Sequence, residues 1–165
     1  NFMATSDKKF HYTIAKILHW SVGFIIAFNL LSGFRIKEFS TEIKQVLIMI
    51  HSGIGILILM LMLFRLWWRR SRNLYAPPRW WKRPSMLLQV IFYPLLMIQP
   101  VIGMLVAIFN EYEVRAFGFI NFSALAAANE SLQSMFFQWH GTLAWLLITL
   151  VFIHGLERTR TILGE

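Results

Sequence analysis

Four long stretches of the chain are almost entirely apolar, and polar residues separate them. They cover about residues 14–34, 46–68, 86–109 and 136–156, and charged side chains enter them only near their ends. Each stretch has about 20 residues or more, enough for a helix to cross a hydrocarbon core about 30 Å thick. The pattern predicts an all-α fold. We expect residues 1–165 to form one domain, a transmembrane up-down four-helix bundle with short loops and no internal repeat.

The composition supports a membrane protein. Apolar residues make up 57% of the chain and charged residues 15%, with a mean hydropathy of +0.56, whereas soluble domains have roughly 25% charged residues. Intrinsically disordered chains instead have low hydrophobicity and high net charge. The chain has no cysteine, which excludes disulfides, zinc–thiolate sites, iron–sulfur clusters and haem attached covalently through C-x-x-C-H.

The basic residues are distributed unevenly between the two ends of the predicted bundle. The net charge is +8, which in a soluble protein would raise the possibility of nucleic-acid binding. Here the termini and the loop between the second and third spans carry twelve basic and three acidic residues. The opposite end carries four basic and five acidic residues. Cytoplasmic loops of membrane proteins are enriched in Lys and Arg. Both termini are therefore predicted to be cytoplasmic, and no nucleic-acid partner is expected.

Two local features depart from regular membrane helices. Pro94 and Pro100 lie inside the third span and are expected to kink it. The longest loop on the outer side lies between Glu111 and Ser134, and its Ala-containing middle, residues 123–132, is expected to form a short interfacial helix.

Four of the five histidines lie inside the predicted spans: His19, His51, His140 and His154. Ionisable side chains in a membrane are costly and usually face the interior of the bundle. His140 and His154 are 14 residues apart, so they lie on nearly the same helix face, about 21 Å apart along the axis. Up-down topology places His19 level with His154 on the inner side, and His51 level with His140 on the outer side.

Two imidazole pairs, each joining two helices at one depth, suit two six-coordinate haems held in a bundle core. A zinc site would gather its ligands at one point, and a proton relay would need intramembrane carboxylates. Ligation by one of the eight methionines is a rival, although packing is the commoner role of methionine in cores. For any single histidine, an interhelical hydrogen bond is the simpler interpretation.

Glycines accompany all four histidines. They would leave room for a flat macrocycle, although small residues also serve close helix packing in membranes. The glycines concerned are Gly23, Gly53, Gly55, Gly141 and Gly155. Because the chain has no cysteine, the haem would be non-covalent haem b.

These features resemble the bacterial cytochrome b-561 family, dihaem membrane proteins related to the cytochrome b subunits of nickel–iron hydrogenases. The resemblance covers roughly residues 10–156 and weakens after His154. The matching segments are Ile17-Leu18-His19-Trp20, Ile50-His51-Ser52-Gly53, Arg65-Leu66-Trp67-Trp68-Arg69, Pro100-Val101-Ile102-Gly103, Trp139-His140 and His154. The resemblance implies a multi-pass protein of the bacterial inner membrane. It also implies that His19 and His154 bind the inner haem iron and that His51 and His140 bind the outer one.

The resemblance also implies a function. In this family two haem b groups carry electrons across the membrane between a donor and the quinone pool of a respiratory chain. We expect membrane lipid, quinone, and a redox partner protein or larger membrane complex as partners. Ser21, Gln89 and Gln99 are polar residues in apolar surroundings and are considered as quinone contacts, but each is expected to be paired across helices instead.

Two other functions remain open. Some relatives resemble superoxide oxidase, a superoxide:ubiquinone oxidoreductase that acts alone and needs positive charge to attract the anion. The outer basic residues Arg35, Lys37, Lys44 and Arg115 alternate with four glutamates, so electrostatic steering is not evident from the sequence. The third function is a haem-free structural or assembly subunit with packed histidines.

Overall fold

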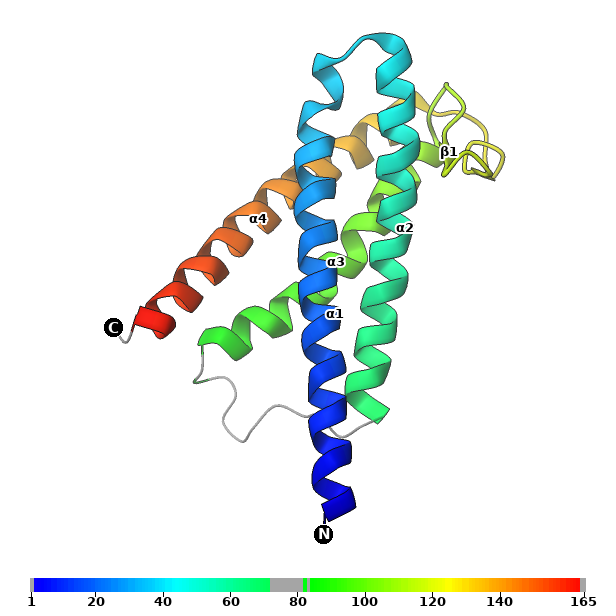
Figure 1. Cartoon of the computed structure of the whole chain (residues 1–165). Helices are drawn as coiled ribbons and strands as arrows, with labels where there is room; N and C mark the ends of the chain where they lie inside the picture. Colours follow the sequence, from blue (N-terminus) through cyan, green and yellow to red (C-terminus); the bar gives the residue numbers. More distant parts are fainter. Residues whose placement is uncertain (1, 72–81, 83, 164–165) are drawn as a thin grey trace.

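The computed structural model describes residues 2–71, 82 and 84–163, and it contains the four predicted helices (Figure 1). They are α1 (Phe2–Arg35), α2 (Thr41–Ser71), α3 (Pro84–Ile108) and α4 (Glu130–Leu163), with a short 3-10 helix, η1 (Ile36–Glu38), after α1. All four are long and apolar enough to cross a membrane, which confirms the all-α transmembrane bundle. Most of the basic loop used to predict orientation, residues 72–81 and 83, lies outside the described residues.

The helices form two antiparallel hairpins. The closest helix–helix packing joins α1 to α2, α2 to α3 and α3 to α4. In Figure 1 the turn between α1 and α2 lies at one end of the bundle, and both ends of the chain lie toward the other. Following the predicted orientation, we call the end with the α1–α2 turn the outer end. α3 stays helical through Pro94 and Pro100.

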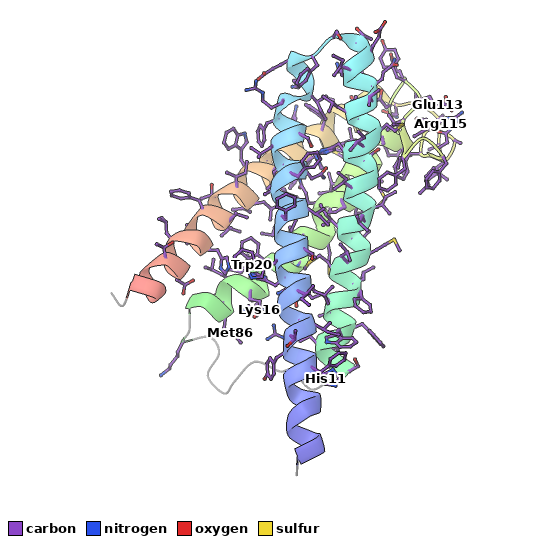
Figure 2. The ribbon with its side chains drawn as sticks, viewed as in Figure 1. His11, Lys16, Trp20, Met86, Glu113 and Arg115 are labelled. Atoms are coloured by element: carbon purple, nitrogen blue, oxygen red, sulfur yellow. The ribbon has the colours of Figure 1, made fainter. Side chains whose placement is uncertain are left out.

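The outside of the bundle is largely apolar, as a lipid-facing surface requires (Figure 2). Large hydrophobic side chains such as Trp20, Phe24, Trp145 and Phe152 are mostly exposed. Soluble monomers rarely expose continuous apolar surface on this scale. The surface is therefore suited to hydrocarbon.

The main core is one layer of side chains in which all four helices meet. It lies between the two histidine levels, since Leu147 is midway between His140 and His154 along α4. Its buried members are Val22, Ile26, Ile58, Met62, Leu96 and Leu147. This layer holds the two hairpins together between the two histidine levels.

The Met62 side chain gives a stability prediction. Met62 is 1% exposed, whereas Met60 on the same helix is 62% exposed. Met62→Ala is expected to lower the free energy of unfolding by about 2–5 kcal/mol, because it leaves a cavity in the core layer. Met60→Ala is the matched control and should change it little. Equilibrium unfolding in mixed micelles, followed by circular dichroism, measures the free energy of unfolding of both variants. An equal decrease in the two variants would contradict the assignment of Met62 to the core.

The expected interfacial helix over residues 123–132 is wrong. Residues 123–126 form turns and bends, residues 127–129 have no regular secondary structure, and α4 begins at Glu130. The loop instead contains a small antiparallel hairpin, β1 (Arg115–Ala116) and β2 (Ile120–Asn121). Side chains satisfy the backbone here: the Ser123 hydroxyl accepts the Val114 N–H, and Asn129 caps α4 by accepting the Leu132 N–H. Such bonds favour turns and helix N-caps over a helix through the segment.

This loop hairpin packs onto the bundle. Val114, Ala116 and Phe122 are buried with Ala107 of α3, next to apolar side chains of α2. The Phe117 N–H donates to the Met49 carbonyl of α2 at 3.2 Å. The loop therefore forms a wall on the outer half of the bundle.

Candidate cofactor-binding site

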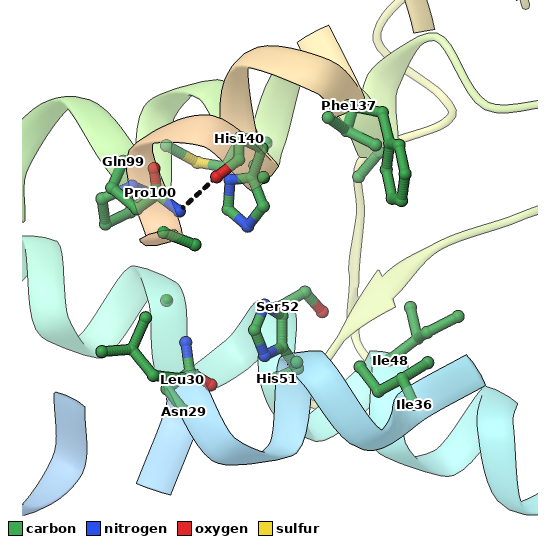
Figure 3. Close-up of a pocket in the computed structure, with 18 of the residues that line it drawn as sticks. Asn29, Leu30, Ile36, Ile48, His51, Ser52, Gln99, Pro100, Phe137 and His140 are labelled. Carbon is green, nitrogen blue, oxygen red and sulfur yellow. Dashed lines mark hydrogen bonds between the residues drawn. The ribbon is translucent and has the colours of Figure 1, made fainter. Parts of the chain in front are cut away.

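The structure brings together the predicted outer pair. His51 of α2 and His140 of α4 face each other across a cavity, as Figure 3 shows. Their ring centroids are 6.1 Å apart, and the ring planes make an angle of 80°. Each histidine has a polar neighbour on the adjacent helix. The His140 carbonyl accepts a hydrogen bond from Gln99 Nε2 at 2.9 Å, and Ser32 Oγ lies 3.5 Å from His51 Nδ1.

The predicted inner pair is also close. The ring centroids of His19 on α1 and His154 on α4 are 5.9 Å apart, with an interplanar angle of 78°. Phe92 of α3 meets the His154 ring edge-on at 6.0 Å. The two pairs thus have nearly the same geometry at two levels of the membrane.

Arg65 adds a positive charge at the inner pair. One guanidinium nitrogen lies 3.3 Å from Nδ1 of His19. The guanidinium carbon lies over the Tyr93 ring, 5.6 Å from its centroid. Arg65 of α2 therefore links α1 and α3 beside the inner histidines. By contrast, the fifth histidine, His11, packs against Trp68 and belongs to neither pair; Figure 2 shows it on the N-terminal part of α1.

The spacing within each pair fits two axial ligands of one metal ion. Two imidazole nitrogens, each about 2 Å from a metal, put the ring centroids about 6 Å apart. Among the described residues, no three His, Asp or Glu side chains are grouped to hold a metal ion. The arrangement therefore suits an ion whose other ligands come from a macrocycle.

The outer pair opens into a cavity of about 580 Å³, within the usual size of small-molecule sites. Its walls are mostly apolar and come from all four helices and from Val114 and Phe122 of the loop. Among the residues that the structure describes, the charged side chains in its lining are Lys37 and Lys44, and none is acidic. Apolar walls with a basic end complement haem b, which is a flat apolar ring with two carboxylates.

Unpaired polar atoms also fit a ligand. Nδ1 of His154 is buried without a hydrogen-bond partner, as is Oε1 of Gln99. Buried polar atoms are rarely unpaired in folded proteins, and each such atom requires an explanation. A bound group is one explanation for a ring nitrogen in this setting.

Glycines near the histidines fall into two groups. A Cβ added at Gly23, Gly55, Gly141 or Gly155 would meet no other atom within 4 Å, so open space lies beside these residues. Gly53, also expected to give a macrocycle room, does not do so, because the Phe117 ring packs against it. That position serves the contact between the outer loop and α2.

Two functional candidates were missed by sequence reasoning: Gly33 of α1 and Gly103 of α3. Their backbones lie directly against the His51 and His140 rings, respectively. Lys37 and Lys44 were also not distinguished from other outer basic residues. The sequence does not show which helix faces pack against each other. Gly33 is distant from His51 along the chain, so their contact could not be predicted. Of the candidate quinone contacts, Gln99 is paired across helices as expected, and Ser21 and Gln89 do not line the cavity.

Comparison with known families decides the identity. The family profile of prokaryotic cytochrome b561 matches residues 11–159, a range that includes all four intramembrane histidines. The chain belongs to this family. As a prokaryotic cytochrome b561 it is a multi-pass bacterial membrane protein, a b-type cytochrome of electron transfer whose cofactor is b-type haem. No curated protein matches the chain.

Proposed function

We propose that this cytochrome b561 holds two haem b groups and carries electrons across the bacterial inner membrane between a donor and the quinone pool. His19 and His154 would bind the inner haem iron, and His51 and His140 the outer one. The observation that carries the proposal is the repeated geometry: two imidazole pairs with ring centroids about 6 Å apart, separated by about 21 Å along α4. Both termini would face the cytoplasm.

The bound haems supply reversible one-electron chemistry. The two histidine pairs would hold them at two depths, with the apolar core layer around Met62 and Leu147 between the levels. Each iron would be held by two histidines, and bis-histidine ligation would favour electron transfer over reaction at the metal. Both pairs lie in membrane-spanning helices, so a quinone confined to the bilayer could exchange electrons with them. A redox partner protein or larger membrane complex would supply or accept the electrons.

The proposal predicts a role for Arg65 in setting the inner haem potential. A cation beside His19 stabilises the reduced haem, which carries one more negative charge. Arg65→Gln is expected to lower the inner haem midpoint potential by on the order of 50 mV at an intermediate effective dielectric constant. Redox titration followed by optical absorbance measures the shift, with Arg35→Gln as the control at the outer end. An unchanged inner potential would contradict this role.

Reconstituted vesicles test the proposed function. Ferricyanide is trapped inside, and an impermeant reductant such as ascorbate is added outside. Vesicles containing the cytochrome should reduce the trapped ferricyanide, whereas vesicles without protein should not. Added quinol should reduce the haems of the detergent-solubilised protein. Failure of both reactions with haem-loaded protein would contradict the proposal.

One observation favours superoxide:ubiquinone oxidoreductase activity as a second candidate. Arg35 pairs with Glu38 at 2.9 Å and Arg115 pairs with Glu113 at 2.8 Å, while Lys37 and Lys44 line the cavity without an acidic neighbour in its lining. The charge at the cavity is therefore positive although the outer face is nearly neutral in sum. Positive charge at a cleft raises the rate at which anions arrive.

Enzymatically generated superoxide, supplied with a soluble ubiquinone, separates the two candidates. Fast quinone reduction by the isolated cytochrome would establish the second. The rate should then fall in the Lys37→Gln/Lys44→Gln variant and at high salt. Purification of folded protein without haem would instead favour the third possibility, a structural or assembly subunit.

A further inference from the structure

We propose that Gly33 and Gly103 are positioning residues for the outer haem, because they hold the imidazoles of His51 and His140 nearly perpendicular to each other. This inference rests on the proposed function, in which these two histidines bind the outer iron. It concerns the orientation of the ligands and does not depend on the electron donor or the quinone.

Each ring lies against a glycine of the neighbouring helix in the same hairpin. A Cβ at Gly33 would lie 2.8 Å from Cε1 of His51, and a Cβ at Gly103 would lie 2.9 Å from Cε1 of His140. Carbon atoms in contact are normally about 3.5–4 Å apart. Any larger residue would therefore collide with the ring in its observed orientation.

The same arrangement occurs on both sides of the cavity. In α1, Asn29 lies one turn before Gly33, and in α3, Gln99 lies one turn before Gly103. Both amide residues line the cavity, and Figure 3 shows Asn29 near His51 and Gln99 near His140. The Gln99 amide also fixes the α4 backbone by donating to the His140 carbonyl. Both hairpins thus place a glycine against the histidine ring and an amide residue one turn before that glycine.

The inner pair lacks this support. The glycines that follow its histidines in sequence, Gly23 and Gly155, have no neighbouring atom within 4 Å of an added Cβ, so neither presses on a histidine of the other helix. Instead, Arg65 and Phe92 contact the inner rings. Substitutions at Gly33 and Gly103 should therefore affect the outer haem alone, and the inner haem provides an internal reference in every sample.

Ligand orientation has a direct spectroscopic readout. When two axial imidazoles are nearly perpendicular, the two iron d orbitals that interact with them are almost equal in energy. The oxidised low-spin haem then gives a strongly anisotropic electron paramagnetic resonance signal with a large maximum g value. A methyl group that turns one ring away from the observed 80° would separate the orbital energies and lower that g value.

The test uses the full-length, haem-loaded protein. The outer signal is assigned as the one missing from His140→Ala. Gly33→Ala and Gly103→Ala should each lower the maximum g value of the outer signal, or remove that signal, while the inner signal stays unchanged. Alanine favours helix over glycine, so the variants should fold. Leu31→Ala and Val101→Ala, at positions 69% and 42% exposed on the same two helices, are the controls and should change neither signal.

The outcomes separate this inference from the proposed function. An unchanged outer signal in both variants, with two haems bound, would overturn the positioning role and leave the dihaem proposal intact. Equal loss of both signals would also overturn it, because it would show a general disruption of the bundle. Wild-type protein without haem would refute the proposed function and this inference together.

Discussion

Replacing His140 with alanine is expected to remove the outer haem and leave the inner haem in place. His140 provides one of the two imidazoles at the outer level, and its ring lies 6.1 Å from that of His51. His19 and His154 form a separate pair on the other side of the core layer, so the inner site does not depend on His140. The haem-to-protein ratio should fall by half. His51→Ala should give the same remaining spectrum.

The chain contains its own control for this experiment. His11 is the histidine that belongs to neither pair and packs against Trp68, so His11→Ala should retain both haems. Haem is measured by absorbance after extraction, and the protein by amino-acid analysis. If His140→Ala lost the inner haem and kept the outer one, the proposed pairing would be wrong.

Replacing His154 with alanine should have the larger functional effect. Its ring is the inner partner of His19 at 5.9 Å, and the variant should lose the inner haem while keeping the outer one. The outer haem should still accept electrons from reductant on its own side. Transfer to the trapped acceptor should fall to the background of vesicles without protein, because one of the two relay positions is empty.

His19→Ala is the matched variant, because it removes the other ligand of the same haem. It should produce the same spectrum and the same loss of transmembrane transfer. Retained transfer in either variant, with only the outer haem bound, would show that electrons do not pass through both levels.

The spans and the histidine levels could be predicted from the sequence, because both depend on periodicity and length. The four apolar stretches became α1 to α4, although α1 and α4 extend well beyond them to Phe2 and Leu163. Up-down topology predicted the histidine pairs, because the rise per residue of a helix gives the depth of each histidine in the membrane from its position in the span. The structure places the same pairs together, and their binding of haem stays a prediction.

Lateral contacts between helices were less predictable. Gly53 follows His51 closely in sequence and was assigned to the macrocycle, yet it faces Phe117 of the outer loop. Gly33 and Gly103 touch the histidine rings but carry no local signal for this role. Lys37 and Lys44 differ from Arg35 and Arg115 because both arginines pair with glutamates two or three residues away in the chain, whereas the two lysines line the cavity. The interfacial helix is absent because the Ser123 hydroxyl accepts a hydrogen bond from the loop backbone and Asn129 caps the start of α4.

The haem content of the purified wild-type protein, measured together with its redox titration, tests the central claim most directly. The proposal predicts two haem b groups per chain, a b-type α band in the reduced-minus-oxidised spectrum, and two reduction steps. One haem per chain, or none, would contradict it.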